Sequence, residues 1–316
     1  MRRSKRSSRG PGKEEPWPQS SAPPRLGSVV VGVDGSESAL SAVLWAAEEA
    51  FMRGSGLFLV HATDTDALAR YLFQAEIDES RRTGRALLDL TAATVSARHP
   101  DVLVVKELSD RPPSGALRHA AARSGTIVVG HRGRGGFASL LLGSVGLRTA
   151  STASTPVVVV RGPTGTGNPG AVLAAVRDDR DLGCARAAAR EALLRQRPLR
   201  LLRVWRTAGS RSERTASRGR PCAQAADHVL AQLRMEGLLR DEFPDLKTEN
   251  EGARNTSVAG ALVEASRDAC LLVVGGHRGP DHPGPTPGRT TLALLRHAHC
   301  PVELVPRHGP GHGSTS

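Results

Sequence analysis

The sequence predicts an α/β protein made of two tandem units, each a doubly wound parallel sheet of five strands with helices on both faces. Three observations predict it. Short runs rich in Val and Leu alternate with longer amphipathic segments, and strands that alternate with helices form parallel sheets through right-handed crossovers. The alternation repeats after roughly 145 residues, a period typical of a duplicated domain. The 316 residues are enough for two domains that each bury a core.

The first unit begins with the segment SVVVGVDGS, which predicts a buried strand ending at Asp34, a turn at Gly35 and a helix N-cap at Ser36. The apolar face of the helix expected at about residues 37–53 consists of Leu40, Val43, Leu44, Ala47 and Phe51. The other elements are expected as strands at 57–62, 102–107, 126–129 and 157–161, and as helices at about 67–98, 113–123 and 143–154.

The second unit repeats this plan. Its elements are expected as strands at 171–176 and 199–205, helices at 181–195 and 223–240, and further elements at 246–251, 257–267, 269–275 and 301–306, with an exposed loop at 210–221. Residues 163–169, PTGTGNP, have the composition of a linker. We therefore expect domains at 27–162 and 170–307, between a basic disordered tail at 1–26 and a second disordered tail at 308–316.

Composition excludes several classes of function. Aromatic residues make up only 3% of the chain, which weighs against single-stranded nucleic acid as a partner, because such binding relies on aromatic stacking. The net charge of +12 could suggest a nucleic-acid partner. However, Arg supplies 39 of the 43 basic residues and is spread along the whole chain instead of forming one basic stripe, so we do not expect nucleic acid to be bound. The four cysteines form no CxxC pair, which predicts free thiols in a reducing compartment and no metal site. No apolar run follows the basic N-terminus, so we expect a cytoplasmic protein without a membrane span.

The segment from Thr126 to Val145 carries the strongest functional signal. A short β-branched strand ends at Gly130, Gly133 follows after two residues, and Gly143-Ser144 follows after nine more. We expect Gly130, Gly133, Gly135 and Gly136 to turn with positive φ and to bring bare backbone close to a ligand, while Gly143-Ser144 opens the next helix. Together with a helix N-terminus, the N–H groups and one hydroxyl suit a phosphate. The alternative is that the glycines only form a tight turn between strand and helix.

This pattern resembles the universal stress protein family, whose nucleotide-binding members carry G-x2-G-x9-G-[S/T] after the fourth strand. The resemblance implies a Rossmann-like fold with strand order 3-2-1-4-5 in each unit. It also implies an adenine nucleotide as ligand, held by Val33, Asp34, Ala62, Gly130, Arg132, Gly133, Gly143, Ser144 and Val145. In this assignment Asp34 and the Ala62 backbone hold the nucleoside, while the glycines and Ser144 hold phosphates. Asp34 could instead serve only as a turn former.

The expected cofactor is ATP, or ADP or AMP, with Mg²⁺ or Mn²⁺ bridging the phosphates, because the loop lacks the Lys of a Walker A sequence. Family members pair through the last strand. The resemblance therefore implies pairing of the two units within one chain, with further association into a homo-oligomer such as a dimer.

The second unit departs from the motif. Gly276 and the three residues after it repeat the start of the loop, but Arg289 stands where the first unit has Ser144, and Arg177 where it has Asp34. Four prolines between the two glycine clusters remove N–H donors. These changes predict that the second unit has lost nucleotide binding.

The sequence therefore predicts a universal stress protein that responds to ATP or a related adenine nucleotide in stress response or signalling. Two alternatives remain open: a scaffold that binds no nucleotide and acts through an unidentified protein partner, and slow ATP hydrolysis at the same site. No catalytic residue is assigned, because no side chain is marked by its spacing as a group that orients water.

Overall fold

The computed structural model describes residues 27–65, 73–121, 125–133, 142–161, 170–206, 221–276 and 287–306. The predicted tails, the linker and the loop at 210–220 lie outside these ranges, as does the start of the helix expected at 67–98. The expected disorder and the domain boundaries remain predictions.

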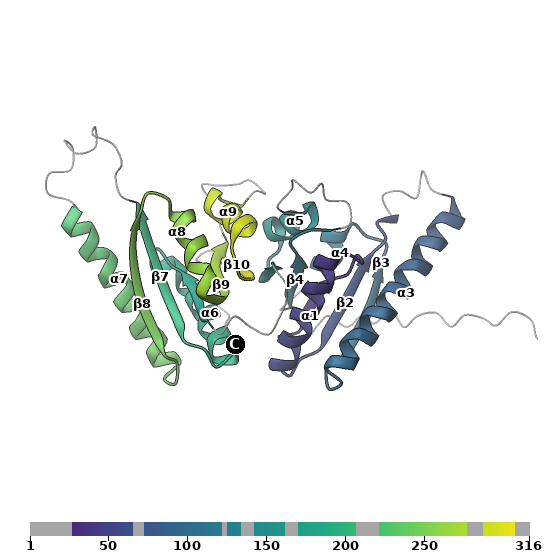
Figure 1. The fold of residues 1–316 in the computed structure, drawn as a ribbon, viewed down its shortest axis with the longest axis horizontal. Coiled ribbons are helices and arrows are strands. Elements are labelled where there is room, and N and C mark those ends of the chain that lie inside the picture. The colour runs from purple at the N-terminus through teal and green to yellow at the C-terminus, as the bar shows by residue number, and fades with distance from the viewer. Residues whose placement is uncertain are drawn as a thin grey trace, which may run out of the picture.

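The described strands form one sheet of ten strands in the order β3-β2-β1-β4-β5-β10-β9-β6-β7-β8 (Figure 1). Each half has the predicted order 3-2-1-4-5, and every neighbouring pair is parallel except β5 and β10. The strands are β1 Val29–Gly32, β2 Leu57–Ala62, β3 Val104–Ser109, β4 Thr126–Gly130, β5 Val157–Val160, β6 Ala171–Ala175, β7 Leu199–Arg206, β8 Thr248–Asn255, β9 Ala269–Gly276 and β10 Val302–Pro306.

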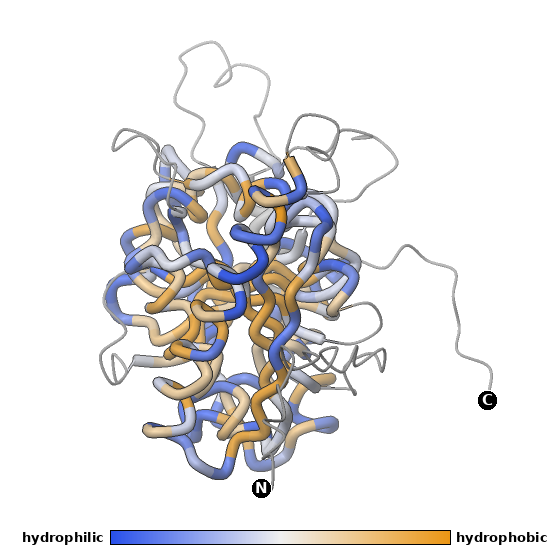
Figure 2. The backbone as a smooth tube through the Cα atoms, turned by 90° about the vertical axis from the view of Figure 1, so that its right-hand side faces the viewer, coloured by the Kyte–Doolittle hydropathy of each residue, from blue (hydrophilic) through white to orange (hydrophobic). Residues whose placement is uncertain are grey.

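Helices cover both faces of this sheet (Figure 1). They are α1 Glu37–Met52, α3 Gln74–Arg98, α4 Pro113–Ala120, α5 Ser144–Thr152, α6 Leu182–Leu194, α7 Pro221–Glu242, α8 Val258–Ala265 and α9 Arg289–His297, with short 3₁₀ turns at Asp179–Asp181 and Ser266–Asp268. Hydrophobic residues concentrate along the central strands and hydrophilic ones at the periphery (Figure 2). The alternating pattern of the sequence thus produces the doubly wound architecture that it predicts.

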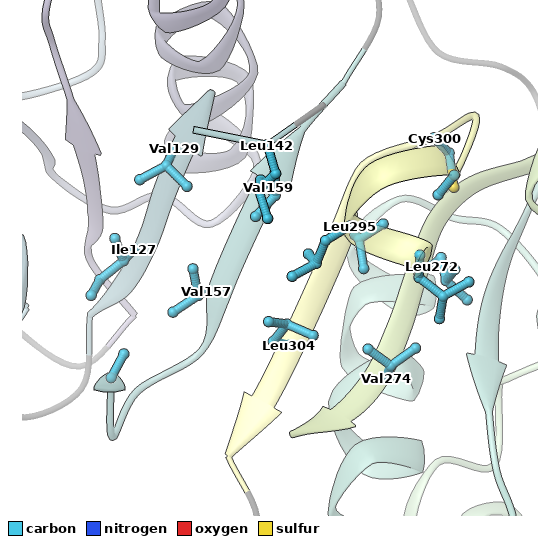
Figure 3. Close-up of a cluster of buried hydrophobic side chains, with 14 of the residues drawn as sticks. Ile127, Val129, Leu142, Val157, Val159, Leu272, Val274, Leu295, Cys300 and Leu304 are labelled. Atoms are coloured by element: carbon cyan, nitrogen blue, oxygen red, sulfur yellow. The ribbon is translucent and has the colours of Figure 1, made fainter. Parts of the chain in front are cut away.

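The two halves join edge to edge through β5 and β10. These strands pair antiparallel, with Val158 directly opposite Glu303, which is the pairing within one chain that the resemblance implies. One apolar cluster, from Val129 and Val157 in the first half to Leu272 and Leu304 in the second, crosses this junction (Figure 3). The strand edges that would otherwise promote aggregation are therefore closed against each other.

The buried face of α1 differs from the predicted one. Leu40 and Phe51 are 46% and 49% exposed, whereas the residues turned to the sheet are Ala39, Ala42, Val43, Ala46, Ala47, Glu49 and Ala50. The helix therefore presents mostly alanines to the strands, and small side chains allow close approach of the helix to the sheet. Hydrophobicity alone pointed to the larger residues, because it does not distinguish a wide apolar stripe from the part that faces the core.

A ring of ion pairs links α1 and α6 beside the junction. The Arg53 guanidinium contacts Glu49 Oε1 at 2.6 Å and Glu191 Oε1 at 2.7 Å, and the Arg195 guanidinium contacts both Glu49 and Glu191. All four side chains are at least 84% buried, because none is more than 16% exposed. Each half thus contributes one Glu and, four residues later, one Arg.

Candidate functional site

A cavity of about 360 Å³ opens in the first half, beside the carboxyl ends of β1, β2 and β4. In open α/β sheets this is the edge where ligands bind. All nine residues that the sequence analysis assigns to a ligand site line this cavity: Val33, Asp34, Ala62, Gly130, Arg132, Gly133, Gly143, Ser144 and Val145. Four separate segments of the chain are therefore brought to one place, while the role of these residues in binding remains to be tested.

Other lining residues were missed by the sequence analysis. They are Gly32, Ala39, Val60, Pro113, Leu117, Val129 and Gly146. Val60, Leu117 and Val129 are buried residues and make an apolar wall. Sequence periodicity marks such residues as core but carries no signal for which core residues border a cavity.

Gly130 and Gly133 are needed because other segments of the chain approach them closely, and not because their backbone has a positive φ. A Cβ at Gly130 would lie 2.5 Å from the Ser38 carbonyl oxygen, and one at Gly133 would lie 2.7 Å from Asp34 Oδ2. In the described residues a positive φ occurs at Gly35 but at none of Gly130, Gly133 and Gly143. The expectation of positive φ was therefore wrong for Gly130 and Gly133, while Gly135 and Gly136 lie outside the described residues. Contact with neighbouring segments, and not turn geometry, excludes a side chain at Gly130 and Gly133.

Asp34 has a structural role and also borders the cavity. Its Oδ1 accepts hydrogen bonds from the Ser36 N–H at 2.9 Å and the Ser36 hydroxyl at 2.7 Å. The Ser36 hydroxyl oxygen in turn accepts from the Ala39 N–H at 3.1 Å, which caps α1 as predicted. The turn-forming function therefore fixes the carboxylate in place, and the carboxylate can still face a ligand.

The helix α5 begins at the cavity without a side-chain cap. Gly143 is its N-cap residue and gives no side-chain cap, and its first turn contains no acidic residue. The Gly143 N–H donates to the His131 carbonyl at 2.8 Å, which anchors the helix start against the loop after β4. Free N–H groups and the positive end of the helix dipole make this end of the cavity suitable for an anion.

The loop after β4 is held by Ser38, a residue that the sequence did not single out. Its hydroxyl oxygen accepts from the Arg132 N–H at 3.1 Å and lies 3.0 Å from His131 Nδ1. Burial, and then the charges of Arg161 and Arg132, lower the pKa of His131 below its usual value. The imidazole is therefore neutral at pH 7, and the positive charge near the loop comes from the two arginines.

The side chain of His61, the neighbour of Ala62 in β2, has a packing role. Its Nδ1 lies 2.7 Å from the Val33 carbonyl oxygen. A Cβ on Gly84 of α3 would approach the ring to 2.6 Å. The imidazole is therefore fixed between a strand and a helix, as expected of a packed histidine.

A second cavity of about 370 Å³ lies at the equivalent place in the second half. Arg177 and Arg289, which replace Asp34 and Ser144, both line it. The loop at 277–286, which carries three of the four prolines and the expected second glycine, lies outside the described residues.

The sequence model of the universal stress protein family matches residues 26–161 and 170–306. The chain belongs to the universal stress protein family. It is 39% identical over 134 residues to a universal stress protein of Mycolicibacterium smegmatis, covering 42% of this chain and 45% of the relative. It is 33% identical over 140 residues to one of Mycobacterium tuberculosis, covering 44% and 46%. The chain thus spans about half the length of the curated relatives it matches.

A solved structure of a universal stress protein from Archaeoglobus fulgidus shares the fold. Its TM-score is 0.64 at 16% identity, over 90% of this chain and all of that one. In the part of the chain that the structure describes, no helix is both long and apolar enough to span a bilayer. Within the same residues, no three His, Cys, Asp or Glu side chains come together as metal ligands. The described cysteines Cys184, Cys270 and Cys300 are free thiols, as predicted.

Proposed function

We propose that the first half of this universal stress protein binds an adenine nucleotide, with ATP as the leading candidate, in the cavity lined by Asp34 and Gly143. The observation that supports the proposal is the convergence of all nine motif residues on that cavity. Its volume of about 360 Å³ lies within the range of small-molecule sites, about 300–1,000 Å³.

The two ends of the cavity differ in chemistry, and this sets the orientation of the ligand. The start of α5, with Gly143 and Ser144, presents N–H groups and a hydroxyl to the phosphates, and Arg132 adds positive charge. The apolar wall of Val60, Leu117 and Val129 suits the base. The Asp34 carboxylate can accept hydrogen bonds from ribose hydroxyl groups.

A divalent ion fits this site only as a companion of the phosphates. Asp34 is the single carboxylate among the described residues that line the cavity. Mg²⁺ is commonly bound by one or two carboxylates together with phosphates and water, so Asp34 is the protein group that would hold Mg²⁺ or Mn²⁺. The ion would neutralise charge on the phosphates.

We propose binding rather than hydrolysis as the biochemical activity. Hydrolysis would need a group that orients the attacking water. Asp34 Oδ1 already accepts hydrogen bonds from Ser36, and His131 Nδ1 faces the Ser38 hydroxyl. A nucleotide-dependent role in stress response or signalling, in the cytoplasm, follows as the proposed cellular function. Phosphate release measured beside nucleotide affinity distinguishes a binder from a slow ATPase.

The decisive experiment is calorimetric titration of the full chain with ATP, ADP and AMP, with and without Mg²⁺. We expect one site per chain, because the second cavity has lost its motif. The double substitution Gly143→Asp, Ser144→Glu places two negative charges at the phosphate end and should abolish this binding. The matched control is Gly288→Asp, Arg289→Glu, which makes the same change in the second half and should leave the ATP site intact. Two equal sites, or binding that survives the first double substitution, would reject the proposal.

A further inference from the structure

The second cavity has kept its size although the nucleotide motif around it is lost. It measures about 370 Å³, against about 360 Å³ in the first half. A pocket without a ligand is under no physical constraint to stay open, because core side chains pack to fill space at little cost when they are aliphatic. The retained volume indicates that the second cavity can hold a ligand, and the residues that line it determine the chemistry of that ligand.

The body of the cavity is aliphatic. Val204 of β7, Val258 and Leu262 of α8, Val274 of β9 and Leu294 of α9 contribute side chains from four elements. Leu262, Val274 and Leu294 are each at most 5% exposed, so these walls are part of the core and hold a fixed shape. A ligand that enters between them gains by burying apolar surface.

The mouth of the cavity carries cationic donors where the first cavity has acceptors. Arg177 and Arg289 line it, and both are exposed enough to reach a ligand. The backbone of Arg177 is fixed, because its N–H donates to the buried Asp181 carboxylate at 2.8 Å. The guanidinium forms a loose ion pair with the same carboxylate, with Nε 3.6 Å from Asp181 Oδ2, and the side chain is 53% exposed, so its other nitrogens can reach a ligand.

The second guanidinium stands at a helix start. Arg289 is the first residue of α9, and its guanidinium forms no ion pair or hydrogen bond with another described residue. Gly288 provides no side-chain cap, and the first turn of α9 has no acidic residue. Thr290 and Thr291 of that turn line the same cavity as Arg177 and Arg289.

We propose that this second cavity binds a small organic acid, with its carboxylate at Arg177 and Arg289 and its apolar body between the aliphatic walls. Guanidinium groups pair with carboxylates through two parallel hydrogen bonds. A nucleoside fits poorly, because its hydroxyl and amino donors would meet Arg177, a donor, at the place of the acceptor Asp34. The Asp181 carboxylate also lines the cavity, but it already accepts from the Arg177 N–H. The proposal stands on residues of the second half alone and does not require a nucleotide in the first.

Octanoate, with octanamide as its neutral counterpart, tests the proposal on the full chain. We expect octanoate to bind at one site per chain, detected by calorimetry and by shifts of Val and Leu methyl signals in NMR spectra. Octanamide, which lacks the charge, should bind at least about tenfold more weakly. Equal binding of both compounds, or no binding of octanoate at millimolar concentration, would overturn the proposal.

Single substitutions identify the site. Arg289→Ala and Arg177→Ala should each weaken octanoate binding about tenfold or more. The matched control is Arg296→Ala, an exposed arginine on the same helix that does not line the cavity, and it should leave affinity within about twofold. If octanoate binding is lost in the Gly143→Asp, Ser144→Glu variant but not in the two arginine variants, the acid occupies the first cavity and the proposal fails.

Discussion

At the residue scale, two glycines of the first cavity are required by atoms that lie far away in sequence. Gly130 approaches Ser38, and Gly133 approaches Asp34, both from the segment around the start of α1. The motif therefore has a packing meaning in addition to its proposed contacts with phosphate: it lets the loop after β4 lie against the loop after β1. A side chain at Gly130 or Gly133 would push the loop after β4 away from the loop after β1.

Gly130→Ala tests this requirement. The added Cβ would lie 2.5 Å from the Ser38 carbonyl oxygen, a backbone atom that has little room to move. We expect a loss of about 1–3 kcal/mol in unfolding free energy, measured by urea denaturation, together with weaker ATP binding. Gly115→Ala on α4 is the matched control, because no atom lies within 4 Å of its new Cβ; it should be neutral or stabilising. Unchanged stability in Gly130→Ala would contradict the packing argument.

Glu303 is a second residue whose role depends on its neighbours. It is 3% exposed, and its Oε2 has no hydrogen-bond partner in the described structure. Burial, then the charge of Glu191, raises its pKa from 4.5 to about 8, against the opposing effects of Arg53 and Arg195. Glu49 also raises it. The side chain is therefore protonated at pH 7 and lies neutral beside the ion-pair ring.

This protonation predicts how stability varies with pH. Between pH 4.5 and about 8 the folded chain holds a proton that the unfolded chain releases, so unfolding free energy falls as pH rises through this window. Glu303→Gln removes the contribution: the variant should match the natural protein near pH 4.5 and be more stable at pH 8 and above. Thermal unfolding across pH measures this, with Glu249→Gln, at an exposed position of β8, as control. A constant difference between variant and natural protein at all pH values would refute the assignment.

At the scale of elements, α1 and α6 are equivalent helices that meet through their charged residues. Glu49 and Arg53 in α1 and its C-cap correspond to Glu191 and Arg195 in α6 and its C-cap. Each arginine bonds both glutamates. Arg195 also lies over the ring of Trp45, 5.5 Å from its centroid. Desolvated charges are tolerated here because every arginine has two carboxylate partners.

Removing one member of the ring should cost more than removing an exposed ion pair. Arg195→Met leaves Glu49 and Glu191 facing each other with one arginine, and we expect a loss of about 3–5 kcal/mol in unfolding free energy. Arg186→Met breaks a pair with Glu242 that is 42% and 35% exposed, and it should cost no more than about 1 kcal/mol. Denaturant unfolding of both variants gives the comparison. Equal losses would show that the ring contributes no more than a surface pair.

At the scale of the whole molecule, the ten-stranded sheet pairs its apolar edges internally and ends in charged ones. β5 and β10 lie at the centre, while β3 and β8 end the described sheet on either side. β8 exposes Glu249, Glu251 and Arg254, and such charged strands resist pairing with another sheet. The homo-oligomer expected from the sequence stays a prediction, and the charged edge at β8 does not favour strand addition there as its mode.

The sequence by itself determined the fold class, the strand order through family resemblance, and nine of the residues that line the first cavity. These follow from local pattern: buried strands, helix caps and a glycine spacing each leave a mark within a few residues. The same local pattern chose Leu40 and Phe51 for the buried face of α1 and expected positive φ at Gly130, and both expectations failed. In each case the deciding contact comes from a segment distant in the chain.

The resemblance implied that the two halves pair through their last strands, and the tertiary structure decided the register and the side-chain contacts of that junction. It placed Val158 opposite Glu303, brought Glu49, Arg53, Glu191 and Arg195 into one buried ring, and left an open cavity behind Arg289. The strand register, the ion-pair ring and the second cavity cannot be predicted from local sequence, because the same charged or small residue can face water or pack against another segment. Burial and proximity are properties of packing, and packing exists only once both halves have folded against each other.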